Sequence, residues 1–365
     1  MLNLFQNGCS VWVASSTEGI LTPTAVALGK FDGVHIGHQR VIKPILPWAQ
    51  DKERWGRENL AEKSTFPTAN VTPLESQKKR IHSTVVTFNP HPQEFFTGQP
   101  RALLTPLDEK VEQLRSLGVE QLVLLPFDKE LSALSPQDFV AKILVQQLQC
   151  QQISVGEDFC FGKKRTGTAK DLQTLAAKFN IPVTIVPIQT DTDELSTNSS
   201  DINTTLTEDN RISTSLIRQS LEAGDIEKAN RLLGRPYSLT GVVIPGQKLG
   251  RSIGFPTANL QLPKDKFLPY QGVYAVRVLI HSQNPEVSPT DNLGVMNIGN
   301  RPTVNATHFA VEVHLFDWSD DLYSKELVVQ LVKFLRPEQK FSSLEALKTQ
   351  IELDCTLARE ILASY

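Results

Sequence analysis

The first half of the chain alternates short apolar runs with longer amphipathic stretches. The apolar runs predict buried strands at Thr24–Leu28, Thr84–Phe88, Gln121–Leu125, Ile153–Gly156 and Pro182–Pro187. The stretches between them predict helices at Gly37–Gln50, Asp108–Leu117, Pro136–Gln149 and Ala169–Phe179. Because proline lacks an N–H, Pro44 and Pro47 are expected to kink or end the first helix. Helices between apolar strands are typical of a parallel α/β sheet with right-handed crossovers.

The pattern changes after about Arg235, where apolar runs punctuated by glycine and proline follow one another without helical stretches. They predict strands at Tyr237–Val243, Gly272–Ile280, Leu293–Ile298, Ala310–Phe316 and Glu326–Leu335. Such a series indicates an antiparallel barrel or a sandwich. The last amphipathic stretch predicts a closing helix over about Ser343–Leu362.

A length of 365 residues favours two domains, and two polar stretches interrupt the pattern. Residues 51–83 are rich in Lys, Glu, Ser and Thr, and residues 191–210 are acidic and hydroxyl-rich, so both are expected to be solvated insertions. We expect an N-terminal domain over 1–189 with the insertion at about 51–83, a helical connector with the second insertion over 190–234, and a C-terminal domain over 235–365.

The amino-acid composition excludes few classes of protein, but it indicates which partners and which cellular compartment to expect. Apolar residues make up 40% and the formal charge is −3, so no overall basic field favours nucleic acid or membrane partners. The four cysteines form no CxxC pair, which suits a reducing compartment or buried thiols. Neither a membrane-spanning run nor a signal-peptide pattern is present. The expected location is the cytoplasm.

The first chemical motif, GKFDGVHIGH at Gly29–His38, follows a predicted strand and opens a predicted helix. Free N–H groups at a helix start attract phosphate. His35 and His38 lie one turn apart on one face, where they can stabilise charge on a triphosphate attacked at its α-phosphorus. A zinc pair or two surface histidines are the plainer alternatives.

This motif resembles the signature of the adenylyltransferase module in bifunctional riboflavin kinase/FAD synthetases, a Rossmann-like HxGH nucleotidyltransferase. FNPHP at Phe88–Pro92, GEDFCFG at Gly156–Gly162 and RISTSLIR at Arg211–Arg218 resemble further segments in the family's order. The family's Ser-Ser-Thr is Ser-Thr-Ser here, which keeps three hydroxyls. A packed aromatic pair and an ordinary helix N-cap are the alternatives for the last two segments.

The resemblance implies residue roles in transferring AMP to FMN. ATP and phosphate contacts would come from Gly29, Phe31, Asp32, Gly33, Gly37, Ser213, Thr214 and Ser215. Flavin contacts would come from Asn89, His91, Asp158, Phe159 and Phe161, and in the C-terminal half from Arg301. His35, His38 and Arg218 would be catalytic. The FMN phosphate is already ionised, so no strong base is expected.

The second motif is GQKLGRSIGFPTAN at Gly246–Asn259. Glycines and two cations can wrap a nucleotide's phosphates, and the residues concerned are Gly246, Lys248, Gly250, Arg251 and Gly254. Thr257 and Asn259 are two residues apart in an extended stretch, so they present neutral oxygens on one side. Such oxygens suit Mg²⁺.

GRxxGFPTAN resembles the riboflavin kinase signature, and NIGNRPT from Asn297 and VEVHLFD from Val311 follow in the family's order. The resemblance implies that Glu312 is the general base for the 5′-hydroxyl of riboflavin. A solvent-facing glutamate on a barrel strand is the alternative. Ser324 stands where the family usually has glycine, which predicts a relaxed turn.

The string FPTAN occurs twice, at Phe66–Asn70 and at Phe255–Asn259. Only the second copy follows GRxxG and precedes a candidate base. The first copy lies in the polar insertion, so we interpret it as a look-alike without a metal role.

Together the motifs predict a bifunctional enzyme. Its C-terminal half would phosphorylate riboflavin to FMN with ATP and Mg²⁺, and its N-terminal half would convert FMN and ATP to FAD and pyrophosphate. No tightly bound redox cofactor is expected. An enzyme with one working half, or a non-catalytic flavin or nucleotide sensor, is the alternative.

Overall fold

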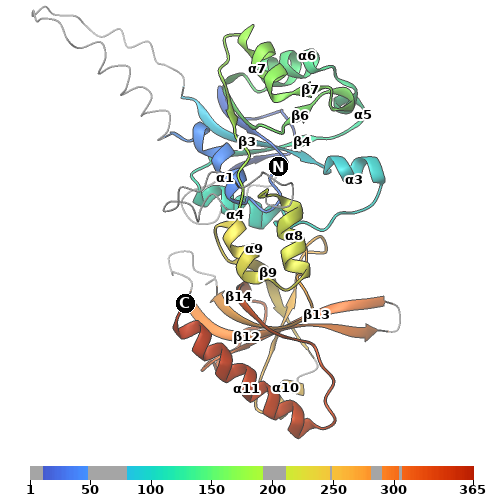
Figure 1. The fold of residues 1–365 in the computed structure, drawn as a ribbon, viewed down its shortest axis with the longest axis vertical. Coiled ribbons are helices and arrows are strands. Elements are labelled where there is room, and N and C mark those ends of the chain that lie inside the picture. The colour runs from blue at the N-terminus through green and yellow to red at the C-terminus, as the bar shows by residue number, and fades with distance from the viewer. Residues whose placement is uncertain (1–10, 48–79, 192–210, 247–248, 281–289, 304–305) are drawn as a thin grey trace, which may run out of the picture. The chain divides into compact units, whose positions relative to one another are not determined.

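The computed structural model describes residues 11–47, 80–191, 211–246, 249–280, 290–303 and 306–365 (Figure 1). They form two compact units: residues 1–101 with 110–193, and residues 102–109 with 194–365. Most of both predicted insertions lies outside the described residues, as does the first FPTAN copy at Phe66–Asn70.

The first unit is built on a six-stranded sheet in the order β1–β4–β3–β2–β5–β8, in which every pairing is parallel. Its strands are β1 (Trp12–Ala14), β2 (Thr24–Leu28), β3 (His82–Asn89), β4 (Gln121–Pro126), β5 (Cys150–Gly156) and β8 (Val183–Val186). A small hairpin pairs β6 (Cys160–Phe161) with β7 (Gly167–Thr168). The predicted parallel α/β sheet is confirmed.

Helices connect these strands. They are α1 (Ile36–Ile42), the 3₁₀ turn η1 (Lys43–Ile45), α3 (Pro92–Thr97), α4 (Leu107–Ser116), α5 (Lys129–Ala133), α6 (Pro136–Asp138), the π-helix η2 (Phe139–Gln147), the 3₁₀ turn η3 (Lys163–Arg165) and α7 (Ala169–Ala177). The predicted first helix ends early, because Pro44 lies in the 3₁₀ turn. The α4 residues up to Glu109 fall in the second unit.

The second unit contains a closed antiparallel barrel in the order β10–β13–β12–β11–β14–β9, which decides between barrel and sandwich. Its strands are β9 (Tyr237–Ile244), β10 (Ala258–Gln261), β11 (Gly272–Ile280), β12 (Thr290–Thr303), β13 (Ala306–Leu315) and β14 (Glu326–Pro337). The pattern missed β10. The prediction of no helix between the strands was wrong, because the one-turn α10 (Leu249–Ser252) precedes β10.

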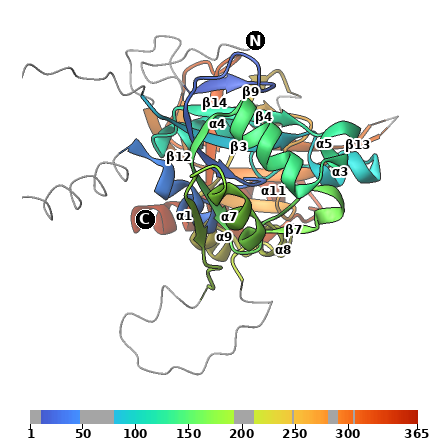
Figure 2. The same ribbon diagram turned by 90° about the horizontal axis from the view of Figure 1, so that it is seen from above.

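Three longer helices complete the second unit: α8 (Thr214–Glu222), α9 (Ile226–Leu233) and α11 (Leu344–Ala363). Ala358 and Leu362 of α11 pack on the outside of the barrel in one cluster with Val273, Val295 and Phe316. Helix α11 runs along the barrel in Figure 1, and Figure 2 gives the same ribbon from above. The predicted closing helix is therefore confirmed, and Ser343 caps it by accepting the N–H of Ala346 at 3.2 Å.

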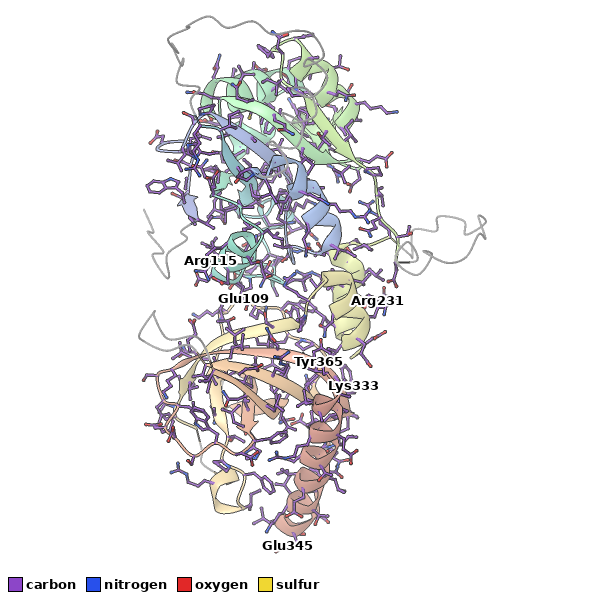
Figure 3. All side chains as sticks on the ribbon, turned by 90° about the vertical axis from the view of Figure 1, so that its left-hand side faces the viewer. Glu109, Arg115, Arg231, Lys333, Glu345 and Tyr365 are labelled. Atoms are coloured by element: carbon purple, nitrogen blue, oxygen red, sulfur yellow. The ribbon has the colours of Figure 1, made fainter. Side chains whose placement is uncertain are left out.

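Residues 102–109 belong to the second unit because they form hydrogen bonds and an ion pair with other residues of that unit. The N–H of Phe267 donates to the Leu103 carbonyl at 2.8 Å. Glu109, labelled in Figure 3, forms a buried ion pair of 2.5 Å with Lys266, and its other oxygen accepts the N–H of Thr240 at 3.2 Å. Burial raises the pKa of Glu109, and the Lys266 charge opposes that shift.

Candidate functional sites

In the sheet of the first unit, three predicted segments follow the carboxyl ends of neighbouring strands. We call this end of the sheet the switch-point edge. The HxGH loop follows β2, Pro90 and His91 follow β3, and Glu157–Phe159 follows β5. Strand β2 lies between β3 and β5, where the strand order reverses. In open parallel sheets, ligands bind beyond the carboxyl ends of the strands at this switch point. The topology therefore places the first candidate site there.

The two histidines of the HxGH loop are stacked, with ring centroids 3.6 Å apart and planes at 21°. His35 is buried and caps α1, where its Nδ1 accepts the N–H of His38 at 3.3 Å. A nitrogen that accepts carries no proton, so the ring proton of neutral His35 is on Nε2. A Cβ on Gly37 would lie 3.1 Å from this ring, which explains the small residue there.

The backbone of the same loop is strained. Phe31 and Val34 adopt left-handed conformations, with φ of 45° and 42°, that non-glycine residues rarely take. A β-branched valine is especially unfavourable in this region. Such strain costs about 1–3 kcal/mol per residue and clusters at functional sites. The loop geometry thus supports a ligand-binding role.

Positive side chains act on His91 and on one another at this end of the sheet, and the motif analysis assigned no role to Lys30, Arg101 or Arg165. Burial, the charge of Lys30 and then that of Arg101 lower the pKa of His91 to about 4. Burial followed by the charges of Arg165 and Arg101 also lowers the pKa of Lys30. Groups that disfavour one another's charge are suited to an anionic ligand. Only the tertiary fold brings these sequence-distant cations together.

The predicted flavin loop divides its two phenylalanines between core and surface. Phe161 is buried against Phe139, with ring centroids 5.5 Å apart. Phe159 is only partly buried and stacks on Phe161 at 5.7 Å and 15°. Asp158 is exposed, and the charge of its carboxylate opposes the lowering of the pKa of Lys30. Phe159 and Asp158 therefore offer more surface to a ligand than Phe161.

A second aromatic group, also missed from the sequence, lies beside the ends of β3 and β4. Phe127 makes edge contacts with Phe88, Phe95 and Phe96 at centroid distances of 5.6, 5.3 and 5.7 Å. Phe96 is 71% exposed. The exposed ring of Phe96, on the helix that His91 caps, suits a planar apolar ligand group.

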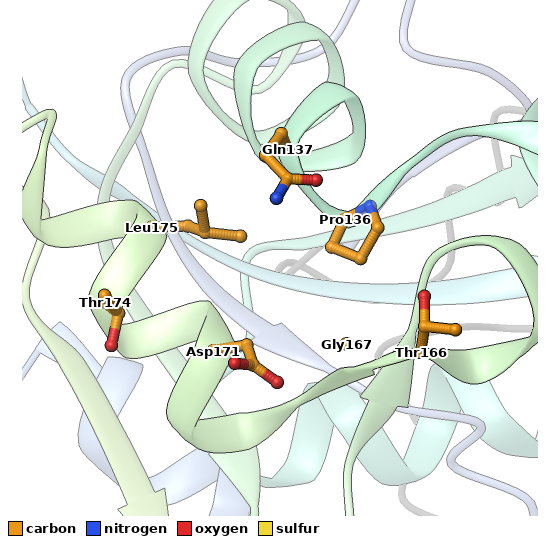
Figure 4. Close-up of a pocket in the computed structure, with 7 residues that line it drawn as sticks. All are labelled: Pro136, Gln137, Thr166, Gly167, Asp171, Thr174 and Leu175. Atoms are coloured by element: carbon orange, nitrogen blue, oxygen red, sulfur yellow. The ribbon is translucent and has the colours of Figure 1, made fainter.

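A half-open hollow of about 380 Å³ lies elsewhere in the first unit (Figure 4). It is lined by Pro136, Gln137, Thr166, Gly167, Asp171, Thr174 and Leu175. None of the predicted site residues lines it, and Asp171 is engaged in the capping box of α7 with Thr168.

The predicted hydroxyl segment belongs to the second unit. Ser213 caps α8 by accepting the N–H of Leu216 at 3.2 Å, and Thr214 and Ser215 form its first turn. Arg218 donates to the Ala102 carbonyl, and its guanidinium lies 4.6 Å from the centre of the Phe267 ring. The phosphate and catalytic roles of this segment stay predictions.

The second candidate site lies on the barrel, where three strands align polar side chains. Glu312 on β13 is the direct cross-strand partner of Asn259 on β10 and of Asn297 on β12. Directly opposed residues point to the same face of a sheet. Thr257 precedes β10, and its hydroxyl lies 3.5 Å from a Glu312 carboxylate oxygen. Sequence reasoning had not included Asn297 in the site.

Glycines let the preceding loop approach this row. A Cβ on Gly246 would overlap the Asn259 amide, and one on Gly250 would overlap the Phe255 carbonyl. Gly254 has a φ of +93°, and Arg251 is exposed. Two predictions cannot be placed, because Lys248 and the side chain of Arg301 lie outside the described residues.

The oxygen donors of this row fit Mg²⁺ in type. Thr257 and Asn259 supply a hydroxyl and an amide, and Glu312 supplies a carboxylate. The close packing of Gly246 on the Asn259 amide holds one of these donors in place. Within the described part of the chain, no group of three or more His, Cys, Asp or Glu side chains forms a metal cluster.

Comparison with known proteins identifies the family. The FAD synthetase family model matches residues 18–55 and 70–200, and the riboflavin kinase model matches residues 233–362. A Pseudomonas fluorescens bifunctional riboflavin kinase/FMN adenylyltransferase is 38% identical over 338 residues, covering 92% of each chain. The chain belongs to the bifunctional riboflavin kinase/FMN adenylyltransferase family.

Other members of the bifunctional family agree. The Escherichia coli K12 protein is 35% identical and covers 92% of this chain and 91% of its own length, and the Bacillus subtilis protein is 34% identical. A solved structure titled a macrolide-efflux protein from Streptococcus pneumoniae shares the fold, with a TM-score of 0.73, 28% identity and coverage of 96% and 98%. No helix among the described residues is long and apolar enough to cross a bilayer.

The bifunctional family carries out both predicted reactions: phosphorylation of riboflavin to FMN and adenylylation of FMN to FAD. The family match also bears on the FPTAN repeat. Phe255–Asn259 falls inside the riboflavin kinase match, whereas residues 56–69, which hold most of the first copy, are skipped by the FAD synthetase match. This gap favours the interpretation of Phe66–Asn70 as a look-alike.

Proposed function

We propose that the two activities use separate sets of residues. Phosphorylation of riboflavin would use Thr257, Asn259 and Glu312 on the barrel of the 235–365 domain. Adenylylation would use the switch-point edge, at the carboxyl ends of β2, β3 and β5 in the 1–189 domain, and Ser213–Arg218 in the 190–234 connector would contact phosphate. The observation that carries the first assignment is the cross-strand pairing of Glu312 with Asn259, with the Thr257 hydroxyl 3.5 Å from the carboxylate.

In the kinase site, Glu312 accepts the proton of the 5′-hydroxyl while that oxygen attacks the γ-phosphorus of ATP. The bond to the β-phosphate bridge oxygen breaks, and ADP leaves. Thr257 and Asn259 would hold Mg²⁺, which when bound neutralises phosphate charge. Backbone N–H groups at Gly250 and Gly254 with Arg251 would contact the phosphates.

In the adenylylation site, an oxygen of the FMN phosphate attacks the α-phosphorus of ATP, and pyrophosphate leaves. The Nε2–H of His35 and a ring N–H of His38, which stacks on His35, would donate to phosphate oxygens. Lys30, Arg101 and Arg165 lower the repulsion between the two phosphate groups. Asn89, His91, Asp158 and Phe159 would contact the flavin. No protein base is needed, since the attacking phosphate is already ionised.

The substrates are riboflavin, FMN and ATP. We place the enzyme in the cytoplasm, which the cysteine pattern supports, since none of the four cysteines forms a CxxC pair.

A His38→Ala variant tests the assignment of the first site. Supplied with FMN and ATP, it should form FAD about 10²–10³-fold more slowly, as when one charge-stabilising donor is removed. Supplied with riboflavin, it should accumulate FMN at the normal rate. FAD formation at the wild-type rate would exclude the proposed role of His38, and loss of FMN formation would exclude separate sites.

A further inference from the structure

The segment in front of β10 cannot continue the barrel ladder by itself. In the antiparallel register Ala258 faces Val313, so Thr257 is next in line to face His314. Pro256 has no N–H to donate, and the strand begins only at Ala258. Without a partner, the Pro256 carbonyl would leave the position of Thr257 poorly defined.

The side chain of His314 supplies that partner. Its Nδ1 lies 2.8 Å from the Pro256 carbonyl oxygen. A carbonyl only accepts, so Nδ1 carries the proton and donates. The ring is also contacted edge-on by Phe255, at a centroid distance of 5.4 Å, and by Phe316, at 6.1 Å. His314 is thereby fixed in one orientation.

We propose that His314 is a positioning residue for phosphoryl transfer. It lies two residues after Glu312 on β13 and therefore points to the same face. By holding the Pro256 carbonyl, it sets the peptide that carries Thr257 and keeps that hydroxyl 3.5 Å from the Glu312 carboxylate. This inference rests on the proposed roles of Thr257 and Glu312. His314 itself does not touch the reacting atoms.

A matched pair of variants isolates the hydrogen bond. In His314→Asn the amide nitrogen can donate from about the position of Nδ1. In His314→Asp the side chain has the same size as asparagine, but its carboxylate only accepts. FMN formation is measured across Mg²⁺ and ATP concentrations, and FAD formation from supplied FMN reports folding in the same full-length protein. We expect His314→Asp to raise the Mg²⁺ half-saturation or lower kcat by about 10–100-fold, as when a group that orients a metal ligand is lost.

For His314→Asn, the Mg²⁺ half-saturation and the kcat of FMN formation should stay within about 3-fold of wild type, well below the loss expected for His314→Asp. FAD formation should be unchanged in both variants. Equal kinase kinetics in the two variants, whether both normal or both impaired, would overturn the proposal. The Thr257→Val variant separates the proposed kinase site from the proposed role of His314. If Thr257→Val leaves FMN formation unchanged, the proposed site fails; if it impairs FMN formation while His314→Asp does not, only the role of His314 fails.

Discussion

Asn259 and Glu312 face each other directly across the β10–β13 ladder of the barrel. One residue closes the FPTAN motif and the other lies more than fifty positions further along the chain. Their pairing brings the amide proposed to hold Mg²⁺ and the proposed base to the same face of the sheet. Neither motif alone could establish this relationship, because it depends on the strand register.

The two FPTAN copies should respond differently to the same substitution. Asn259→Ala removes an amide that is 8% exposed and is expected to lower riboflavin phosphorylation about 10–100-fold, as for loss of a group that orients a metal site. Asn70→Ala is the matched control and should leave the rate unchanged. The measurement is FMN formation from riboflavin and ATP, and equal losses in both variants would contradict a single site.

The protonation of His91 should limit stability at acid pH. Its neutral Nδ1 accepts the N–H of Gln93 at 3.1 Å and caps α3. The folded-state pKa of about 4 is below the ordinary value of 6.5, so the folded protein binds fewer protons than the unfolded chain between these values. The contribution of His91 is therefore complete above pH 6.5 and is lost as the pH falls toward 4.

Replacing Lys30 with methionine tests the cause of this shift. Lys30 is the second contributor after burial, so Lys30→Met should raise the pKa of His91 toward 6.5, as followed by NMR titration of the ring. The same variant should slow FAD formation and spare FMN formation. An unchanged His91 pKa would show that Lys30 does not act on the ring.

The sequence predicted both sheet types because buried strands leave a strong apolar pattern, and it placed the GKFDGVHIGH motif correctly after β2. It missed β1 and β10, which are too short to show a period. Lys30, Arg101 and Arg165 were missed for another reason. A single cation carries little signal of its own, and the effects of Lys30 and Arg101 on His91, and of Arg165 on Lys30, become evident only when the chain is folded.

Breaking the buried pair between Glu109 and Lys266 should destabilise the second unit. Glu109→Gln leaves the Lys266 ammonium buried without its counter-charge, at a cost of about 3–5 kcal/mol. Replacing both residues with methionine removes both charges and should recover most of that loss. Chemical unfolding of the full chain measures both variants. A double variant no more stable than Glu109→Gln would show that the pair itself is not the source.

Ser324 should be a site of stored strain. The sequence predicted a relaxed turn, but Ser324 keeps the left-handed conformation that favours glycine, with a φ of 61°. Ser324→Gly should therefore stabilise the protein by about 1 kcal/mol. Ser319→Gly, in the same connection but without positive φ, is the control and should destabilise slightly. Equal effects of the two substitutions in thermal unfolding would exclude strain at Ser324.

The Glu312→Gln variant tests most directly the claim that one chain holds two separable sites. The substitution keeps the size of the side chain but removes the base, which should slow riboflavin phosphorylation by about 10²–10⁴-fold. Products are separated by chromatography after incubation with ATP and Mg²⁺, once with riboflavin and once with FMN. We predict almost no FMN or FAD from riboflavin, and normal FAD formation from FMN. Normal FMN formation from riboflavin, or loss of FAD formation from FMN, would contradict the account.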